Sequence, residues 1–161
     1  MSSEAPTLPE RSRQVQEQVT KAGLSSQVRV LPDSARTAKL AAAALGCTVG
    51  AIANSLVFMA DGAPLLVMTS GDHRANTDVI AAAVQANEVR MATPDEVRAA
   101  TGQAIGGVAP VGHPVPLTTL VDEHLRTYEQ IWTAGGTPSS VMPMTFDELV
   151  NLTSGTVTTV A

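Results

Sequence analysis

The sequence predicts an α/β fold in which a sheet packs closely against alanine-rich helices, and three observations support this prediction. Helical and strand-like segments alternate along the chain. Hydrophobic residues make up 44% of the 161 residues, which suits a globular domain with a sizeable core. Aromatic residues make up only 2%, so Ala, Val, Leu, Ile and Met must form that core, and alanine-rich helices can approach a sheet closely.

The first half of the chain predicts three helices and three strands. Helical patterns occur at residues 9–22, 34–45 and 76–85, and strand patterns occur at 28–31, 51–59 and 64–69. Ser34 is the expected N-cap of the second helix, and Gly46 follows its last turn. Asp61 and Gly62 are typical of a hairpin turn, so the strands on either side of them should pair. Residues 1–8 are expected to form a frayed tail.

The second half predicts shorter elements. Strand patterns occur at residues 89–91, 117–121, 129–134, 141–144 and 156–160, with helices at 94–101 and 146–151 and a helical turn that begins at residue 122. Thr93 and Thr145 are the expected N-caps of the two helices. The sequence contains no repeats and no low-complexity linker, so we expect one domain over residues 1–161.

The charge and the single cysteine restrict the kinds of site that the chain can carry. The formal net charge of −5 argues against a broad nucleic-acid-binding face, which needs clustered Lys and Arg. It does not exclude binding of one nucleotide at the end of a nucleic-acid strand. Cys47 is the only cysteine, so an intrachain disulfide and a thiolate metal cluster are impossible. Its place behind a helix end favours packing over a catalytic thiol, because the sequence places no base beside it.

Other familiar motifs are missing from the sequence. His73, His113 and His124 have no second ligand at i+3 or i+4, and neither a P-loop nor a G-x-S-x-G motif occurs. We therefore expect no metal, no cofactor and no protein nucleophile. No run of 18 apolar residues and no signal-peptide pattern occurs, so we expect a cytoplasmic protein without membrane contact.

The segment 102–114 combines four glycines, two prolines and a histidine with small apolar residues and no charge. Glycines allow a backbone to come close to a ligand or to adopt positive φ, and Pro110 fixes φ and removes an N–H donor. One interpretation is a preformed wall whose main-chain groups face a ligand. The other is a turn or bulge between two buried strands.

Two pairs of polar residues are further candidates. Asn54 and Ser55 interrupt an apolar strand, where they form either a polar edge or the lining of a pocket at one end of the sheet. Asp72 and His73 form either an acid/base pair or part of a solvated loop, since adjacent side chains often point apart.

Four stretches occur in an order that resembles the YbaK/prolyl-tRNA-synthetase-associated editing domains. They are residues 51–58, 69–74, 102–112 and 133–136, and the resemblance extends from about residue 25 to the end. It implies a mixed β-sheet that curls toward a barrel and is flanked by helices. It also implies hydrolysis of the ester between a wrong amino acid and tRNA, such as Cys or Ala on tRNA for proline.

The resemblance also implies roles for individual residues. The G-x-x-x-P motif of the family falls on Gly106 to Pro110, whose backbone would meet the 3′-terminal aminoacyl-adenosine. Asn54 and Gly106 are the candidate catalytic residues, and the candidate substrate-binding residues are Ser55, Ser70, His73, Gly107, Pro110, His113 and Gly135. Members with editing activity carry a lysine where this chain has Asn54, which keeps an amide donor but has no charge.

The leading hypothesis is a free-standing aminoacyl-tRNA deacylase that acts in trans by positioning a water and the ester, without metal or protein nucleophile. Its expected partners are the 3′ end of an aminoacyl-tRNA and an aminoacyl-tRNA synthetase, with no DNA and no membrane. The alternative is a non-catalytic module that binds an aminoacyl-tRNA end, a nucleotide or a protein partner, because Asn54 replaces the lysine. A third hypothesis is hydrolysis of a small ester unrelated to tRNA, which suits the acidic charge.

The net charge predicts a weak salt dependence of tRNA binding. Few phosphates should be contacted, with Arg36, Lys39, Arg74 and Arg90 as the candidate cations. The slope of log affinity against log salt should therefore be about −1 to −3, measured by binding titrations over a salt series. A slope of about −8 would show a broad basic face and contradict the prediction.

Overall fold

The computed structural model describes residues 8–32, 35 and 37–161, so Ser34, Arg36 and nearly all of the predicted tail lie outside the described residues. The helices are α1 (Glu10–Lys21), α2 (Ala38–Leu45), α3 (Thr77–Val84), α4 (Pro94–Thr101) and α5 (Phe146–Thr153), with the 3₁₀ turns η1 (Val49–Ala51) and η2 (Glu123–Thr127). The strands are β1 (Arg29–Val30), β2 (Ile52–Ala60), β3 (Ala63–Ser70), β4 (Val89–Met91), β5 (Thr118–Asp122), β6 (Ile131–Ala134), β7 (Ser140–Met144) and β8 (Thr156–Thr158).

The predicted helices and strands are all present, with bounds that differ by a few residues. The largest difference is at α2, which begins at Ala38 rather than at residue 34. The Thr37 hydroxyl caps it by accepting a hydrogen bond from Leu40 N at 3.2 Å. Thr93 and Thr145 cap α4 and α5 as predicted, each within a reciprocal capping box.

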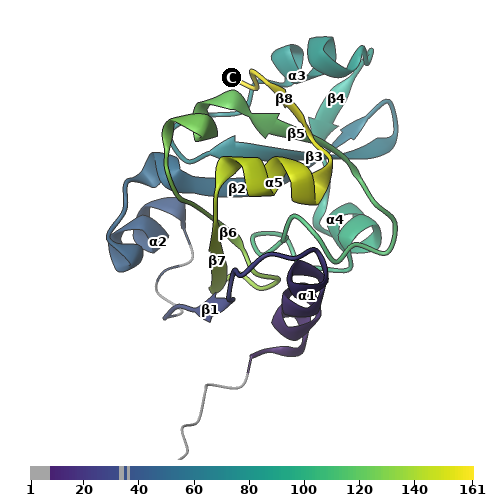
Figure 1. Ribbon diagram of the computed structural model, residues 1–161. Helices are drawn as coiled ribbons and strands as arrows, with labels where there is room; N and C mark the ends of the chain where they lie inside the picture. The colour runs from purple at the N-terminus through teal and green to yellow at the C-terminus, as the bar shows by residue number, and fades with distance from the viewer. Residues whose placement is uncertain (1–7, 33–34, 36) are drawn as a thin grey trace, which may run out of the picture.

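The strands form one mixed sheet in the order β1-β7-β6-β2-β3-β5-β8, with β4 also paired to β2 (Figure 1). The β2–β3 hairpin at its centre is antiparallel, whereas β5 and β8 add parallel strands beyond β3. The prediction of a mixed sheet flanked by helices is confirmed, but the sheet is open and does not close into a barrel.

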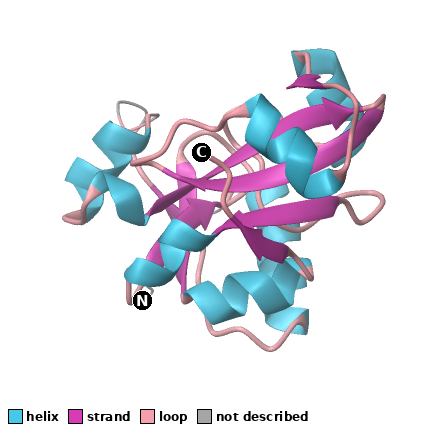
Figure 2. Ribbon diagram, turned by 90° about the horizontal axis from the view of Figure 1, so that it is seen from above, coloured by secondary structure: helices cyan, strands magenta, loops and turns pink. Residues whose placement is uncertain are grey.

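Helices cover both faces of the twisted sheet (Figure 2). Alternation along β2 directs Ala53 and Val57 into the largest core cluster, which includes side chains of α1, α4 and α5. Ile52 and Phe58 point to the other face, where Ile52 packs near α2 and Phe58 packs against α3. Within the described residues, no helix has the length and apolar character needed to cross a bilayer.

The edge of β2 that faces away from β3 is shared by two short strands. Parallel β6 pairs with Ile52 and Ala53, and antiparallel β4 pairs with Phe58 to Ala60. Across the chain as described, no strand pairs with residues 54–57 on this edge, so the sheet has a gap in its middle.

Glu96 joins the first turn of α4 to β4. Its two carboxylate oxygens accept hydrogen bonds from the two terminal nitrogens of Arg90, each at 2.8 Å, and one of them also accepts from Thr93 N at 2.9 Å. The Arg90 hydrogen bonds, followed by the backbone N–H of Thr93, lower the pKa of Glu96 to about 2.

Glu96→Gln should therefore change how stability depends on pH. A carboxyl whose pKa is lowered on folding contributes stability above its unfolded pKa of about 4.5 and loses it as the pH falls toward 2. Wild type should be more stable than Glu96→Gln above pH 4.5, and the difference should shrink toward pH 2. Thermal melts over this range, with exposed Glu17→Gln as the control, measure it; a difference independent of pH would contradict the prediction.

Candidate functional site

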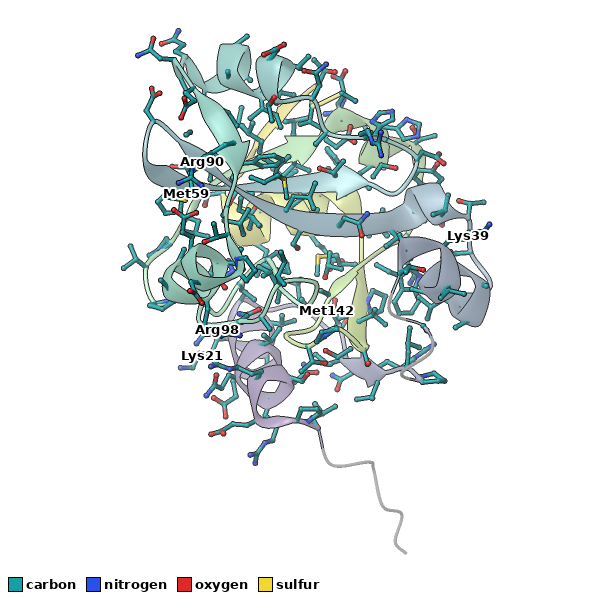
Figure 3. The ribbon with its side chains drawn as sticks, turned by 180° about the vertical axis from the view of Figure 1, so that it is seen from behind. Lys21, Lys39, Met59, Arg90, Arg98 and Met142 are labelled. Carbon is teal, nitrogen blue, oxygen red and sulfur yellow. The ribbon has the colours of Figure 1, made fainter. Side chains whose placement is uncertain are left out.

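A pocket of about 230 Å³ opens beside the gap in β2. Residues of α2 form one side, residues 52–57 of β2 form the floor, and the segment after α4 and strands β6 and β7 form the other sides. In the view from behind, Lys39 on α2 lies near one end of β2, and Met59 and Arg90 lie near the opposite end of that strand (Figure 3).

Three predicted site residues lie together in this pocket: Asn54, Ser55 and Gly106. The other polar lining residues are Thr37, Thr133 and Ser140, and no described lining residue carries a titratable side chain. Cys47 is not a lining residue: it packs against the core cluster that contains Trp132, and burial raises the pKa of its thiol. Chemistry in this pocket therefore depends on neutral hydrogen-bonding groups of these residues.

The two adjacent glycines of the Gly-rich segment have different roles. Gly106 has φ of +89°, and apart from its two chain neighbours no heavy atom of the described residues lies within 4 Å of the position that a Cβ would occupy. A Cβ on Gly107 would overlap the backbone of Thr137 and Pro138 in the β6–β7 turn. Gly106 is thus open at the pocket, whereas Gly107 permits close packing of two loops.

Gln103, which is not among the residues predicted from the sequence, fixes the conformation of the Gly-rich segment. Its side chain is buried, with Oε1 accepting from Ala109 N at 2.7 Å and Nε2 donating to Val111 O at 3.1 Å. No described strand pairs with this segment, so one amide side chain satisfies main-chain groups that a sheet would otherwise satisfy. The sequence does carry one sign of this role, because Gln103 is the single amide side chain in an uncharged, glycine-rich stretch.

The other predicted residues of this region lie outside the pocket lining. His113 Nε2 donates to Ala109 O at 2.8 Å, and burial lowers the pKa of its imidazole. Pro110 is buried beside Ala109. A Cβ on Gly135 would press on Val28 and Ser140, so that glycine serves close packing.

Ser70 and His73 lie in a separate polar cluster. The buried carboxylate of Asp122 accepts from Ser70 N at 3.0 Å and from His73 Nδ1 at 2.8 Å, and the Ser70 hydroxyl donates to Gly50 O at 2.7 Å. Hydrogen bonds from Tyr128 and His124 lower the pKa of Asp72. Asp72 and His73 thus have different partners.

Several known proteins are similar to this chain. The model of the family described as the aminoacyl-tRNA editing domain matches residues 32–152. A proline–tRNA ligase of Nitratidesulfovibrio vulgaris (strain DP4) is 30% identical over 93 residues, which are 58% of this chain but only 16% of the ligase. The uncharacterized protein YwhH of Bacillus subtilis (strain 168) is 30% identical over 117 residues, or 72% of this chain and 74% of YwhH.

Solved structures share the whole fold. A crystal structure provisionally assigned as a trans-editing enzyme for prolyl tRNA synthetase superposes with a TM-score of 0.91 and 42% identity, covering 95% of this chain and 98% of the other. The hypothetical protein APE2540 superposes with a TM-score of 0.84 and 29% identity, covering 91% and 98%.

The glycine geometry predicts different defects for Gly106→Ala and Gly107→Ala. Gly106→Ala should lower binding or turnover tenfold or more while costing about 1–2 kcal/mol of backbone strain. Gly107→Ala should lower the melting temperature more, because its Cβ meets backbone atoms.

Gly23→Ala is the matched control, because Gly23 has φ of +86° and open space around its Cβ position but lies outside the pocket lining. It should show the strain cost without a loss of activity. Melting curves and turnover or ligand-binding assays on the three variants measure both effects. Equal activity of Gly106→Ala and Gly23→Ala would show that Gly106 is only a turn residue.

Proposed function

Because the chain belongs to the aminoacyl-tRNA editing domain family, we propose that it hydrolyses the ester of a mischarged aminoacyl-tRNA, acting in trans. The observation that carries the proposal is the uncharged pocket that unites Asn54, Ser55 and Gly106. The likeness to a provisionally assigned trans-editing enzyme over 95% of the chain supports action in trans, and the proline–tRNA ligase relatives support tRNA for proline as the first substrate to test.

The pocket size favours a small acyl group. Its volume of about 230 Å³ lies below the roughly 300–1,000 Å³ typical of drug-sized ligands. A small aminoacyl group would fill it, and the ribose and adenine would lie toward the mouth. Met91 and Ile105, which are 49% and 51% exposed, offer apolar surface there.

The proposed reaction needs only water and oriented donors. Water attacks the ester carbonyl, the bond from the carbonyl carbon to the ribose oxygen breaks, and the products are the free amino acid and tRNA with a free hydroxyl. The Asn54 amide donates to the carbonyl oxygen as negative charge develops on it, and the Gly106 backbone contacts the ribose. Such a substrate places the protein in the compartment of translation, the cytoplasm.

A second candidate function is a module that binds an aminoacyl-tRNA end without hydrolysing it. The neutral Asn54 favours it, because the pocket lacks the ammonium carried at this position in editing members of the family. No other described lining residue supplies a positive charge.

Release of amino acid from a panel of mischarged tRNAs, including Ala and Cys on tRNA for proline, tests the two functions. We expect release above a buffer blank, and Asn54→Ala should lower it tenfold or more, about 1.4 kcal/mol of transition-state stabilisation. The exposed Asn151→Ala should act like wild type. Release from no substrate would refute the deacylase function, and release by Asn54→Lys alone would favour the binding module.

A further inference from the structure

The gap in the sheet lies inside the pocket. On the edge of β2 away from β3, pairing with β6 ends at Ala53, and pairing with β4 begins at Phe58. Residues 54–57 between these points all line the pocket. Along these residues the outer edge of β2 therefore faces the pocket instead of a neighbouring strand.

Ser55 is the residue whose main-chain groups both point into the gap. Ile52 O accepts from Gly71 N at 2.8 Å on the β3 side, whereas Val57 O accepts from Ala92 N at 3.0 Å on the opposite edge. Successive residues of a strand direct their N–H and C=O groups to opposite edges, so Ser55 shares the edge of Val57. Its N–H and C=O are therefore placed to pair with one residue of an extended chain.

Thr133 belongs to the lining of the same pocket, and its hydroxyl is buried. Its side chain lines the pocket at 1% exposure, and Oγ1 has no hydrogen-bond partner among the described residues. An unpaired buried hydroxyl costs about 1–3 kcal/mol, so a ligand that supplied the partner would recover that cost. Thr133 pairs in register with Ala53, two residues before Ser55.

We propose, building on the function proposed above, that the aminoacyl group docks as a single β-residue opposite Ser55. Its α-ammonium donates to the Ser55 carbonyl, and the Ser55 N–H donates to the ester carbonyl, as in one hydrogen-bonded pair of an antiparallel ladder. Thr133 Oγ1 accepts a further hydrogen bond from the ammonium. The Ser55 N–H thereby also stabilises the negative charge that develops when water attacks.

This pairing selects the substrate by its main-chain chemistry. An acyl group without an α-nitrogen cannot donate to the Ser55 carbonyl, so it loses one of the two paired hydrogen bonds and the contact with Thr133. The amino-acid side chain stands roughly perpendicular to the pairing direction, where the apolar walls of the pocket limit its size. Recognition of the α-amino ester and recognition of its side chain are thus carried out by different groups.

Replacing the Ser55 N–H with an ester oxygen, by incorporating the α-hydroxy analogue of serine at position 55, tests the donor directly. No described strand pairs with this N–H in the free protein, so the melting temperature should fall only by the weakening of the adjacent Asn54 carbonyl, which becomes an ester carbonyl and a poorer acceptor toward β3. Turnover of alanyl-tRNA for proline should fall on the order of tenfold, the effect of one lost hydrogen bond. Turnover equal to that of wild type would overturn the role of the Ser55 N–H.

Thr133→Val and Thr69→Val form a matched pair for the hydroxyl. Both remove a buried hydroxyl without a described partner, so neither should lower stability much, but only Thr133 lines the pocket. Thr133→Val should lower turnover on the order of tenfold, whereas Thr69→Val should leave it unchanged. Equal turnover of the two variants would remove Thr133 from the proposal.

Amide NMR of the native protein separates this inference from the proposed function. The probe is alanine joined through an amide to 3′-amino-3′-deoxyadenosine, and its propionyl counterpart, which lacks the α-nitrogen, is the control. The Ser55 amide proton should shift downfield with the alanyl probe, and the propionyl probe should bind at least tenfold more weakly. A Ser55 shift without any hydrolysis would refute only the deacylase function, whereas hydrolysis without a Ser55 shift would refute only the pairing.

Discussion

The antiparallel pairing of β2 with β3 determines where the other parts of the molecule lie. It runs from Ala53 opposite Ser70 to Ala60 opposite Ala63, and β5 extends the sheet beyond β3. The outer edge of β2 is left to two strands that arrive from different parts of the chain, parallel β6 and antiparallel β4. They meet β2 at its two ends and leave room between them, so the pocket is a consequence of sheet topology.

The Gly-rich segment, residues 102–114, lines the pocket opposite α2 and is held in place without regular secondary structure. Gln103 satisfies the main chain at Ala109 and Val111, and Gly107 lets the segment rest on the backbone of the β6–β7 turn. These contacts leave Gly106 open without leaving the rest of the loop loose. A loop fixed in this way loses less conformational entropy when a ligand binds, which favours affinity for a small ligand.

The sequence predicted the local features of the fold well, because caps, hairpin turns and hydrophobic periodicity act over a few residues. Its ordered motifs also made Asn54, Ser55 and Gly106 candidate site residues, and the fold brings these three to one pocket. Ser70 and His73 instead contact Asp122, a residue about 50 positions away that no local pattern links to them. The gap beside Ser55 depends on the register of three strands, and such long-range pairing leaves no mark on the β2 sequence.

The gap also bears on the solubility of the protein. Unpaired main-chain groups along a strand edge can form hydrogen bonds with a strand of another chain, and such pairing leads to aggregation. Here the free stretch is bounded by β6 and β4, and it lies within a pocket walled by α2 and the Gly-rich segment. A peptide strand needs several consecutive pairs to bind, and the flanking strands already occupy those positions. The unpaired stretch of β2 is thus too short and too enclosed for a neighbouring polypeptide to add a strand to it.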